Sequence, residues 1–203
     1  MKKNKISKNW INRQRKDIYV RKSKIEGYRS RAVYKLEEIN QKFKIFHSGA
    51  SVLDLGAAPG SWSQYILKNY KNIKLASIDL KNFDEIKNSY QIKGDFTEDI
   101  YKKKILNYFQ KKIDIVLSDM AVNTTGNKNL DSIQTSELCL DAMRFSKEVL
   151  KKDGVFVSKI FIGSTFNEIL DESKKIFRKN KVFKPPASRK ESKESFIISS
   201  MLR

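Results

Sequence analysis

Two aspartates and one lysine stand where apolar segments of the chain end or are interrupted, and their types could do chemistry. Asp79 ends the apolar run 73–79, and Asp95 lies in "GDF" after a second short run. Lys159 lies inside "GVFVSKIF", where burying a charge is costly. A carboxylate at a strand end can bind a ribose diol or an adenine amino group, and a buried lysine can act as a base or stabilise an oxyanion. The alternative for Lys159 is a stem that carries its charge out to solvent, and for each aspartate a helix cap.

The turn inside "SVLDLGAAPGSWSQYIL" (51–67) predicts where a cofactor would bind. Gly56 and Gly60 let the backbone approach a ligand closely, and Pro59 stiffens the turn. The pattern D-x-G-x-x-P-G differs from the dinucleotide fingerprint G-x-G-x-x-G, because Ala58 stands where the middle glycine would receive a pyrophosphate. We therefore expect a cofactor without phosphates.

The order of this turn, Asp79 and Asp95 along the chain favours S-adenosylmethionine, which carries a ribose, an adenine and a cationic sulfonium. Each signal is weak alone, since a small-residue turn or an aspartate at a strand end is often structural. Together they favour a methyltransferase over an NAD-dependent dehydrogenase, whose phosphate-binding glycine is missing.

The elements that must position these residues alternate along the chain. Apolar runs predict six strands, over residues 51–55, 73–79, 90–93, 113–119, 154–161 and 195–202. Periodic patterns predict five helices, over residues 30–43, 61–70, 97–110, 131–150 and 165–177. Thr97 is the expected N-cap of the third of these helices. Strands alternating with helices indicate a mostly parallel α/β sheet covered on both faces. We expect one such domain over 30–203, preceded by a basic extension over 1–29 whose first 16 residues fray or order on a partner.

Positive charge is concentrated at the two ends. The chain carries a net charge of +19. Residues 1–50 hold 15 Lys and Arg against 4 Asp and Glu, and residues 174–203 hold 10 Lys and Arg against 2 Asp and Glu. The residues between these two ends have no net charge. Such a distribution favours a polyanion such as nucleic acid, with a solvated basic tail as the alternative.

Composition excludes several classes of protein. The single Cys139 permits no intrachain disulfide, and with one histidine, His47, it cannot form a zinc site. No apolar run approaches the ~18 residues of a membrane span. We expect a cytoplasmic protein with no metal in its site.

The atom to be methylated is inferred from residues outside the cofactor turn. Cytosine C5 chemistry needs a nucleophilic cysteine, whereas Cys139 occupies an apolar helix position. Exocyclic amines are usually methylated beside an Asn/Asp-Pro-Pro-aromatic loop, which "SDMAVNTTG" lacks. A ribose hydroxyl needs a base or a stabilising cation, and Lys159 suits both roles.

Five motifs in order resemble the FtsJ-type ribosomal RNA 2′-O-ribose methyltransferases. They are "YRSRAVYKLEEI", "VLDLGAAPGSWSQ", "SDMAVNTTG", "GVFVSKIF" and "KPPASRKESKESFII", and the likeness runs from Trp10 to the end. It implies a Rossmann-like class I S-adenosylmethionine-dependent fold with seven strands, the last antiparallel. It also implies a catalytic tetrad of Lys35, Asp119, Lys159 and Glu194, and cofactor contacts from Gly60, Trp62, Asp79, Asp95 and Asp119.

The chain departs from the family pattern at two positions. Ser61 replaces the second glycine of "APGGW", where a serine can open a helix. Val122 replaces a frequent proline beside the reacting groups, so the shape of that loop is open. Neither change removes a member of the tetrad.

The resemblance implies a substrate as well. The motif "KPPASRKES" and the compact length favour the bacterial rRNA branch, hence a 23S rRNA uridine in the assembled large subunit and a monomeric enzyme without other protein partners. Two alternatives stay open: a tRNA 2′-O-ribose methyltransferase, and a catalytically silent RNA-binding assembly factor. A small-molecule methyltransferase would leave the charge of +19 unexplained.

Overall fold

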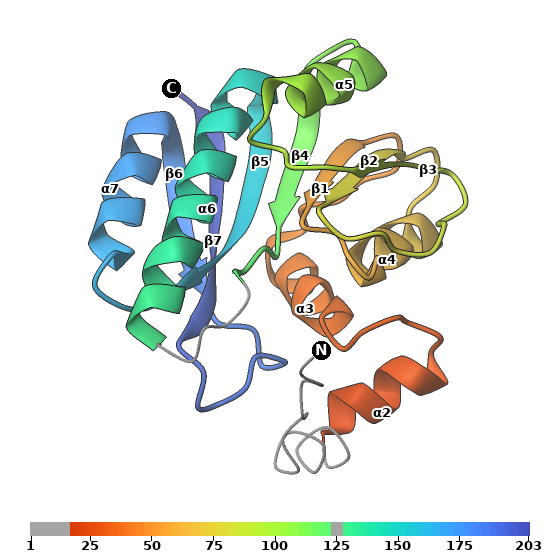
Figure 1. Ribbon diagram of the computed structural model, residues 1–203, viewed down its shortest axis with the longest axis horizontal. Coiled ribbons are helices and arrows are strands. Elements are labelled where there is room, and N and C mark those ends of the chain that lie inside the picture. Colours follow the sequence, from red (N-terminus) through yellow and green to blue (C-terminus); the bar gives the residue numbers. More distant parts are fainter. Residues whose placement is uncertain (1–16, 123–127) are drawn as a thin grey trace, which may run out of the picture.

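Seven strands form one sheet in the order β3-β2-β1-β4-β5-β7-β6 (Figure 1). The computed structural model describes residues 17–122 and 128–203. The strands are β1 (Ser51–Leu55), β2 (Lys74–Asp79), β3 (Ser89–Lys93), β4 (Ile113–Ser118), β5 (Leu150–Phe161), β6 (Phe177–Phe183) and β7 (Glu194–Leu202). The helices are α2 (Ile18–Ile25), α3 (Val33–Phe43), α4 (Ser61–Asn69), α5 (Asp99–Phe109), α6 (Lys128–Val149) and α7 (Phe166–Ile176). Strand β7 is antiparallel to β5 and β6, and the other pairs are parallel.

Helices cover both faces of the sheet. Helices α5, α6 and α7 contribute to one apolar cluster with the strands, and α3 and α4 contribute to a second on the other face. Strand β1 lies between these clusters and is buried at all five positions, which explains why its sequence is apolar apart from Ser51 and Asp54.

The sheet order determines where a ligand can bind. From β1 the chain continues to β2 and β3 on one side of the sheet, and then crosses to β4 on the other side of β1. The strand order therefore reverses beside β1. Open α/β sheets bind their ligands at such a point. Gly56 and Asp119 follow the carboxyl ends of β1 and β4 there. Because β7 runs the opposite way, its first residue, Glu194, pairs with Phe161 at the same edge.

The predicted sheet class and all six predicted strands are confirmed, and three local features differ. Thr97 does not cap α5: Glu98 is the N-cap, while Thr97 donates to Asp95. The resemblance implied a seventh strand, but its place at β6 was not predicted, because "FRKNKVF" shows no alternation of apolar residues and forms an edge strand. Helix α2 was not predicted either, and the expectation for residues 1–16 lies outside the described residues.

No helix within the two described ranges is long and apolar enough to cross a membrane.

Part of the predicted N-terminal extension packs on the domain. The Asp17 carboxylate accepts the N–H groups of Tyr19 and Val20 at the start of α2 and pairs with Arg31. The Tyr19 ring lies 5.4 Å from that of Tyr34, and its hydroxyl donates to Glu38 at 3.2 Å. The boundary at residue 29 stays a prediction.

We expect Asp17→Ala to loosen α2. The change removes the helix cap, worth about 0.5–2 kcal/mol, and takes a partner from the half-buried Arg31 guanidinium. Amide hydrogen exchange should quicken in α2 while β1 stays protected. Asp99→Ala, at the start of α5 with only a surface pair to Lys102, is the control. Equal exchange in α2 for both variants would contradict this role of Asp17.

Candidate active site

The four residues of the predicted tetrad meet in one connected row of charges. Lys159 Nζ lies 3.1 Å from Asp119 Oδ1 and donates to the Asp119 carbonyl at 2.7 Å. Lys35 Nζ lies 3.6 Å from Asp119 Oδ2 and donates to Glu194 at 2.9 Å. Two carboxylates therefore alternate with two ammonium groups, and Asp119 stands between both lysines.

Four different elements bring these side chains together. Asp119 directly follows β4, and its neighbour Ser118 pairs with Ser158, so Asp119 emerges beside Lys159 of β5. Glu194 begins β7, and Lys35 comes from the first turns of α3. Ser188 Oγ, in the loop before β7, donates to the second oxygen of Glu194 at 2.8 Å and orients it.

Burial makes these charges interact strongly. Lys159 is 7% exposed, and the side chains of Lys35, Asp119 and Glu194 are 13–17% exposed. Burial alone would lower the pKa of Lys35, but the charges of Asp119 and Glu194 outweigh it and raise that pKa. Burial would raise the pKa of Asp119, but Lys159 and Lys35 hold it below its usual value. Lys35 and Asp119 are therefore both charged at neutral pH.

A cavity of about 470 Å³ opens beside the tetrad, above the turn that follows β1. Three of the five predicted cofactor residues line it, namely Asp79, Asp95 and Asp119, together with apolar side chains that include Leu80, Phe96, Met120 and Leu138. Gly56 has φ +72°, and a Cβ there would lie 2.3 Å from Met120 Cγ. Only glycine leaves room for Met120 at the floor of this cavity.

The hydrogen-bond acceptors in this cavity fit S-adenosylmethionine. The Asp79 carboxylate is fixed by the N–H groups of Ala58 at 2.9 Å and Lys81 at 2.8 Å, and each oxygen keeps a lone pair for a ribose hydroxyl. Asp95 uses Oδ1 to hold Thr97, which leaves Oδ2 to accept from an adenine amino group. The apolar walls suit the face of an adenine ring. These assignments stay predictions.

Gly60 and Trp62 are absent from the residues that line this cavity. Gly60 has φ +102°, and a Cβ there would lie 2.6 Å from Ile86 and 2.8 Å from Arg29. The Trp62 side chain is buried; its indole N–H donates to the Ala32 carbonyl at 2.8 Å. Trp62 thereby joins the start of α4 to the start of α3, and its contact with a cofactor stays a prediction.

A second cavity of about 490 Å³ lies on the other side of Lys35 and Glu194. Its lining also includes Ser30, Arg31, Arg189 and Ser192. The tetrad thus stands between two cavities, with Asp119 facing the first and the Lys35–Glu194 pair facing the second.

Two arginines of the basic stretch before Lys35 are committed to protein contacts. Arg29 donates to the carbonyls of Pro59, Asp84 and Glu85, which ties the cofactor turn to the loop after β2. Arg31 bonds Asp17 and the Ala187 carbonyl. Both guanidinium groups therefore already bind protein groups, and neither is available, as it stands, to bind a phosphate of the substrate.

Several residues of the site were not found from the sequence. Leu80, Phe96 and Met120 line the first cavity, and Ser188 orients Glu194. Leu80, Phe96 and Met120 each follow a predicted aspartate by one position, and that position relative to the aspartate could have identified them from the sequence. Ser188 lies six residues before Glu194 in the loop that leads into β7, and its residue type alone carries no such signal.

The sheet order, with β7 antiparallel and the cavity above the first turn, defines the class I methyltransferase fold that uses S-adenosylmethionine. The family model of the FtsJ-like methyltransferases matches residues 28–201, so the chain belongs to that family. A protein of Pelagibacter ubique named ribosomal RNA large subunit methyltransferase E is 63% identical over the full length of both chains. A Rickettsia akari protein of the same name is 46% identical, over 95% of this chain and 88% of its own.

A solved structure agrees with this assignment. A Plasmodium falciparum protein, assigned provisionally as a ribosomal RNA methyltransferase, is 35% identical and covers 86% of this chain and 98% of its own, with a TM-score of 0.77. The likeness therefore extends over most of the chain.

A buried carboxyl group below the cofactor turn has an unusual ionisation. Asp54, in β1, accepts from Ser63 Oγ at 2.8 Å, and Ser63 contacts Ser77 at 2.8 Å. Burial raises the pKa of Asp54 to about 7; the Ser63 hydrogen bond opposes this, while the charges of Asp119 and Asp79 add to it. Asp54 is thus partly protonated at neutral pH and ties β1 to the start of α4.

We expect Asp54→Asn to change how stability depends on pH. A raised folded pKa means that the native state holds the proton more tightly than the unfolded state, so this group costs stability as pH rises from about 4 through about 7. Relative to wild type, the variant should gain stability between pH 5 and pH 8, as measured by urea unfolding. The exposed Asp153→Asn is the control. A difference from wild type that is the same at both pH values would contradict the raised pKa.

Proposed function

We propose that this protein transfers the methyl group of S-adenosylmethionine to a ribose 2′-hydroxyl of large-subunit ribosomal RNA. The observation that carries the proposal is the tetrad between the two cavities, one suited to the cofactor and the other bordered by basic residues. The names of the relatives from Pelagibacter and Rickettsia supply the substrate class. The target we favour is a 23S rRNA uridine in the assembled subunit, with the enzyme acting as a cytoplasmic monomer.

In this proposal Lys159 acts on the reacting hydroxyl. Lys159 Nζ uses two contacts on Asp119, which leaves its remaining position for the 2′-oxygen. Lys159 either takes the hydroxyl proton or, when charged, stabilises the oxyanion that forms while the hydroxyl proton passes to solvent water. S-adenosylmethionine, when bound, supplies the methyl group and leaves as an uncharged thioether.

The other three members position Lys159 and set the field around it. Asp119 holds Lys159 by its carbonyl and its carboxylate. Lys35, held charged by Glu194 and Asp119, adds positive charge beside the reacting oxygen, which stabilises an oxyanion there.

We expect Lys159→Met to lower kcat by about 10²–10⁴-fold, the range of a general base, while binding of S-adenosylmethionine persists. Lys159→Arg keeps the charge and cannot be deprotonated. If the Lys159→Arg variant has nearly wild-type activity, Lys159 acts by stabilising charge. If its activity is as low as that of Lys159→Met, Lys159 acts as a base. Full activity in the methionine variant would contradict a catalytic role for Lys159.

The substrate is tested with labelled S-adenosylmethionine on three RNAs: large subunits from cells lacking this protein, free rRNA and bulk tRNA. Label on large subunits, mapped to a ribose hydroxyl, is the expected result. Label on tRNA alone would keep the chemistry and replace the substrate. No label on any, with the cofactor bound, would favour a silent assembly factor.

A further inference from the structure

A basic hollow lies on the sheet face that carries α3, beyond the end of that helix. Its volume is about 390 Å³. We call it the β6 groove; it is lined by Phe43, Ile45, Val155, Arg178, Lys179, Asn180, Lys181, Ile198 and Ser200. Lys44 caps the end of α3 beside it, and Lys42 reaches over Phe183 of β6, with Nζ 4.3 Å from the ring centroid.

The floor of the groove is apolar and its rim is cationic. Val155 and Ile198 belong to β5 and β7, and α3 ends at Phe43 before it covers them fully. Arg178, Lys179 and Lys181 are all exposed on β6. The residues that line the groove include no carboxylate.

The cations at this rim lack acidic partners. Within residues 17–122 and 128–203, none of Lys44, Lys179 and Lys181 is within ion-pair distance of a carboxylate, and neither is Arg178. The neighbouring helix differs, because on α7 Lys174 pairs with Asp171 and Lys175 with Glu172.

An edge strand can also carry lysines that oppose pairing with another sheet. That role accounts for Lys179 and Lys181 on β6. It does not account for Lys42 and Lys44 on a different element, nor for the hollow between them.

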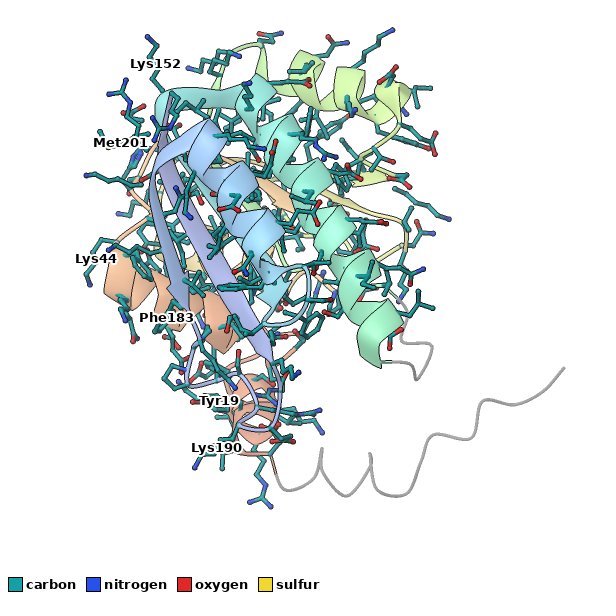
Figure 2. The ribbon with its side chains drawn as sticks, turned by 90° about the vertical axis from the view of Figure 1, so that its left-hand side faces the viewer. Tyr19, Lys44, Lys152, Phe183, Lys190 and Met201 are labelled. Carbon is teal, nitrogen blue, oxygen red and sulfur yellow. The ribbon has the colours of Figure 1, made fainter. Side chains whose placement is uncertain are left out.

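The groove leads to the active site along β7. Lys181 pairs with Ile198 and Phe183 with Phe196, while Glu194 of the tetrad is the first residue of that strand. Four residues separate Ile198 from Glu194, or roughly 13 Å, which equals about four base steps of a stacked nucleic-acid strand. Figure 2 shows Lys44 and Phe183 along the same flank of the molecule.

We propose that the β6 groove binds the phosphate backbone of the RNA substrate a few nucleotides from the methylated ribose. The inference rests on the proposed function for its substrate. Phosphates would contact the lysine and arginine rim, and sugar or base edges would pack on the apolar floor. The role complements the tetrad, because Arg29 and Arg31 near Lys35 are already bound to protein groups.

The test compares two variants of equal net charge. Lys179→Glu/Lys181→Glu reverses two charges of the groove, and Lys103→Glu/Lys111→Glu reverses two exposed charges on α5 and in the turn before β4. Affinity for large subunits and for protein-free 23S rRNA is measured at several salt concentrations. Circular dichroism and S-adenosylmethionine affinity verify the fold of each variant.

We expect the groove variant to bind both RNAs at least 10-fold more weakly near physiological salt, and its slope of log affinity against log salt to fall by about 2. The control should change less than 3-fold. Equal weakening in both variants would overturn the proposal, since net charge alone would then explain it. Loss of binding to subunits but not to protein-free rRNA would also overturn it, in favour of an acidic ribosomal protein.

The readout is binding, so it separates this inference from the proposed function. RNA binding that depends on the groove without any methyl transfer would contradict the proposed function alone. If methyl transfer is observed but RNA binding is unchanged in the groove variant, only the proposed role of the β6 groove is contradicted.

Discussion

The ion pairs that Asp119 makes with two buried lysines are the interaction on which the site depends. Lys159 and Lys35 could not share a poorly solvated space without a carboxylate between them, because two unscreened cations would repel. Adjacent strands β4 and β5 bring Asp119 to Lys159, and antiparallel β7 brings Glu194 to Lys35 at the same edge. The sheet order is therefore part of the chemistry.

The cofactor cavity depends on a turn that is held from three sides. Asp54 anchors the start of α4 from below, Asp79 fixes the turn through the Ala58 N–H, and Arg29 binds the Pro59 carbonyl from outside. Arg29 and Trp62 also connect this turn and α4 to the segment that leads to Lys35. The cofactor turn and the segment that carries Lys35 are thus held in place by direct hydrogen bonds to each other.

The excess of positive charge serves more than one purpose in the fold. Lys35 and Lys159 belong to the reaction site, whereas Arg29 and Arg31 join loops and helices through backbone carbonyls and Asp17. The basic side chains of β6, by contrast, form no ion pair with any carboxylate of residues 17–122 and 128–203. Net charge alone predicts a polyanionic substrate. The contacts of each side chain are needed to distinguish the cations that are available to bind this substrate from those that already bind protein groups.

The sequence by itself determined six of the seven strands, the turn after β1 and the residue types at the strand ends, because these depend on local periodicity and on neighbouring residues. Lys159 stood out as a charge inside an apolar strand, and the ordered motifs supplied Lys35, Asp119 and Glu194. Only the tertiary structure decided that these four touch, that Trp62 points into the core and that "FRKNKVF" forms the edge strand. Those outcomes depend on contacts between residues far apart in the chain, such as Lys35 with Glu194, which no local pattern encodes.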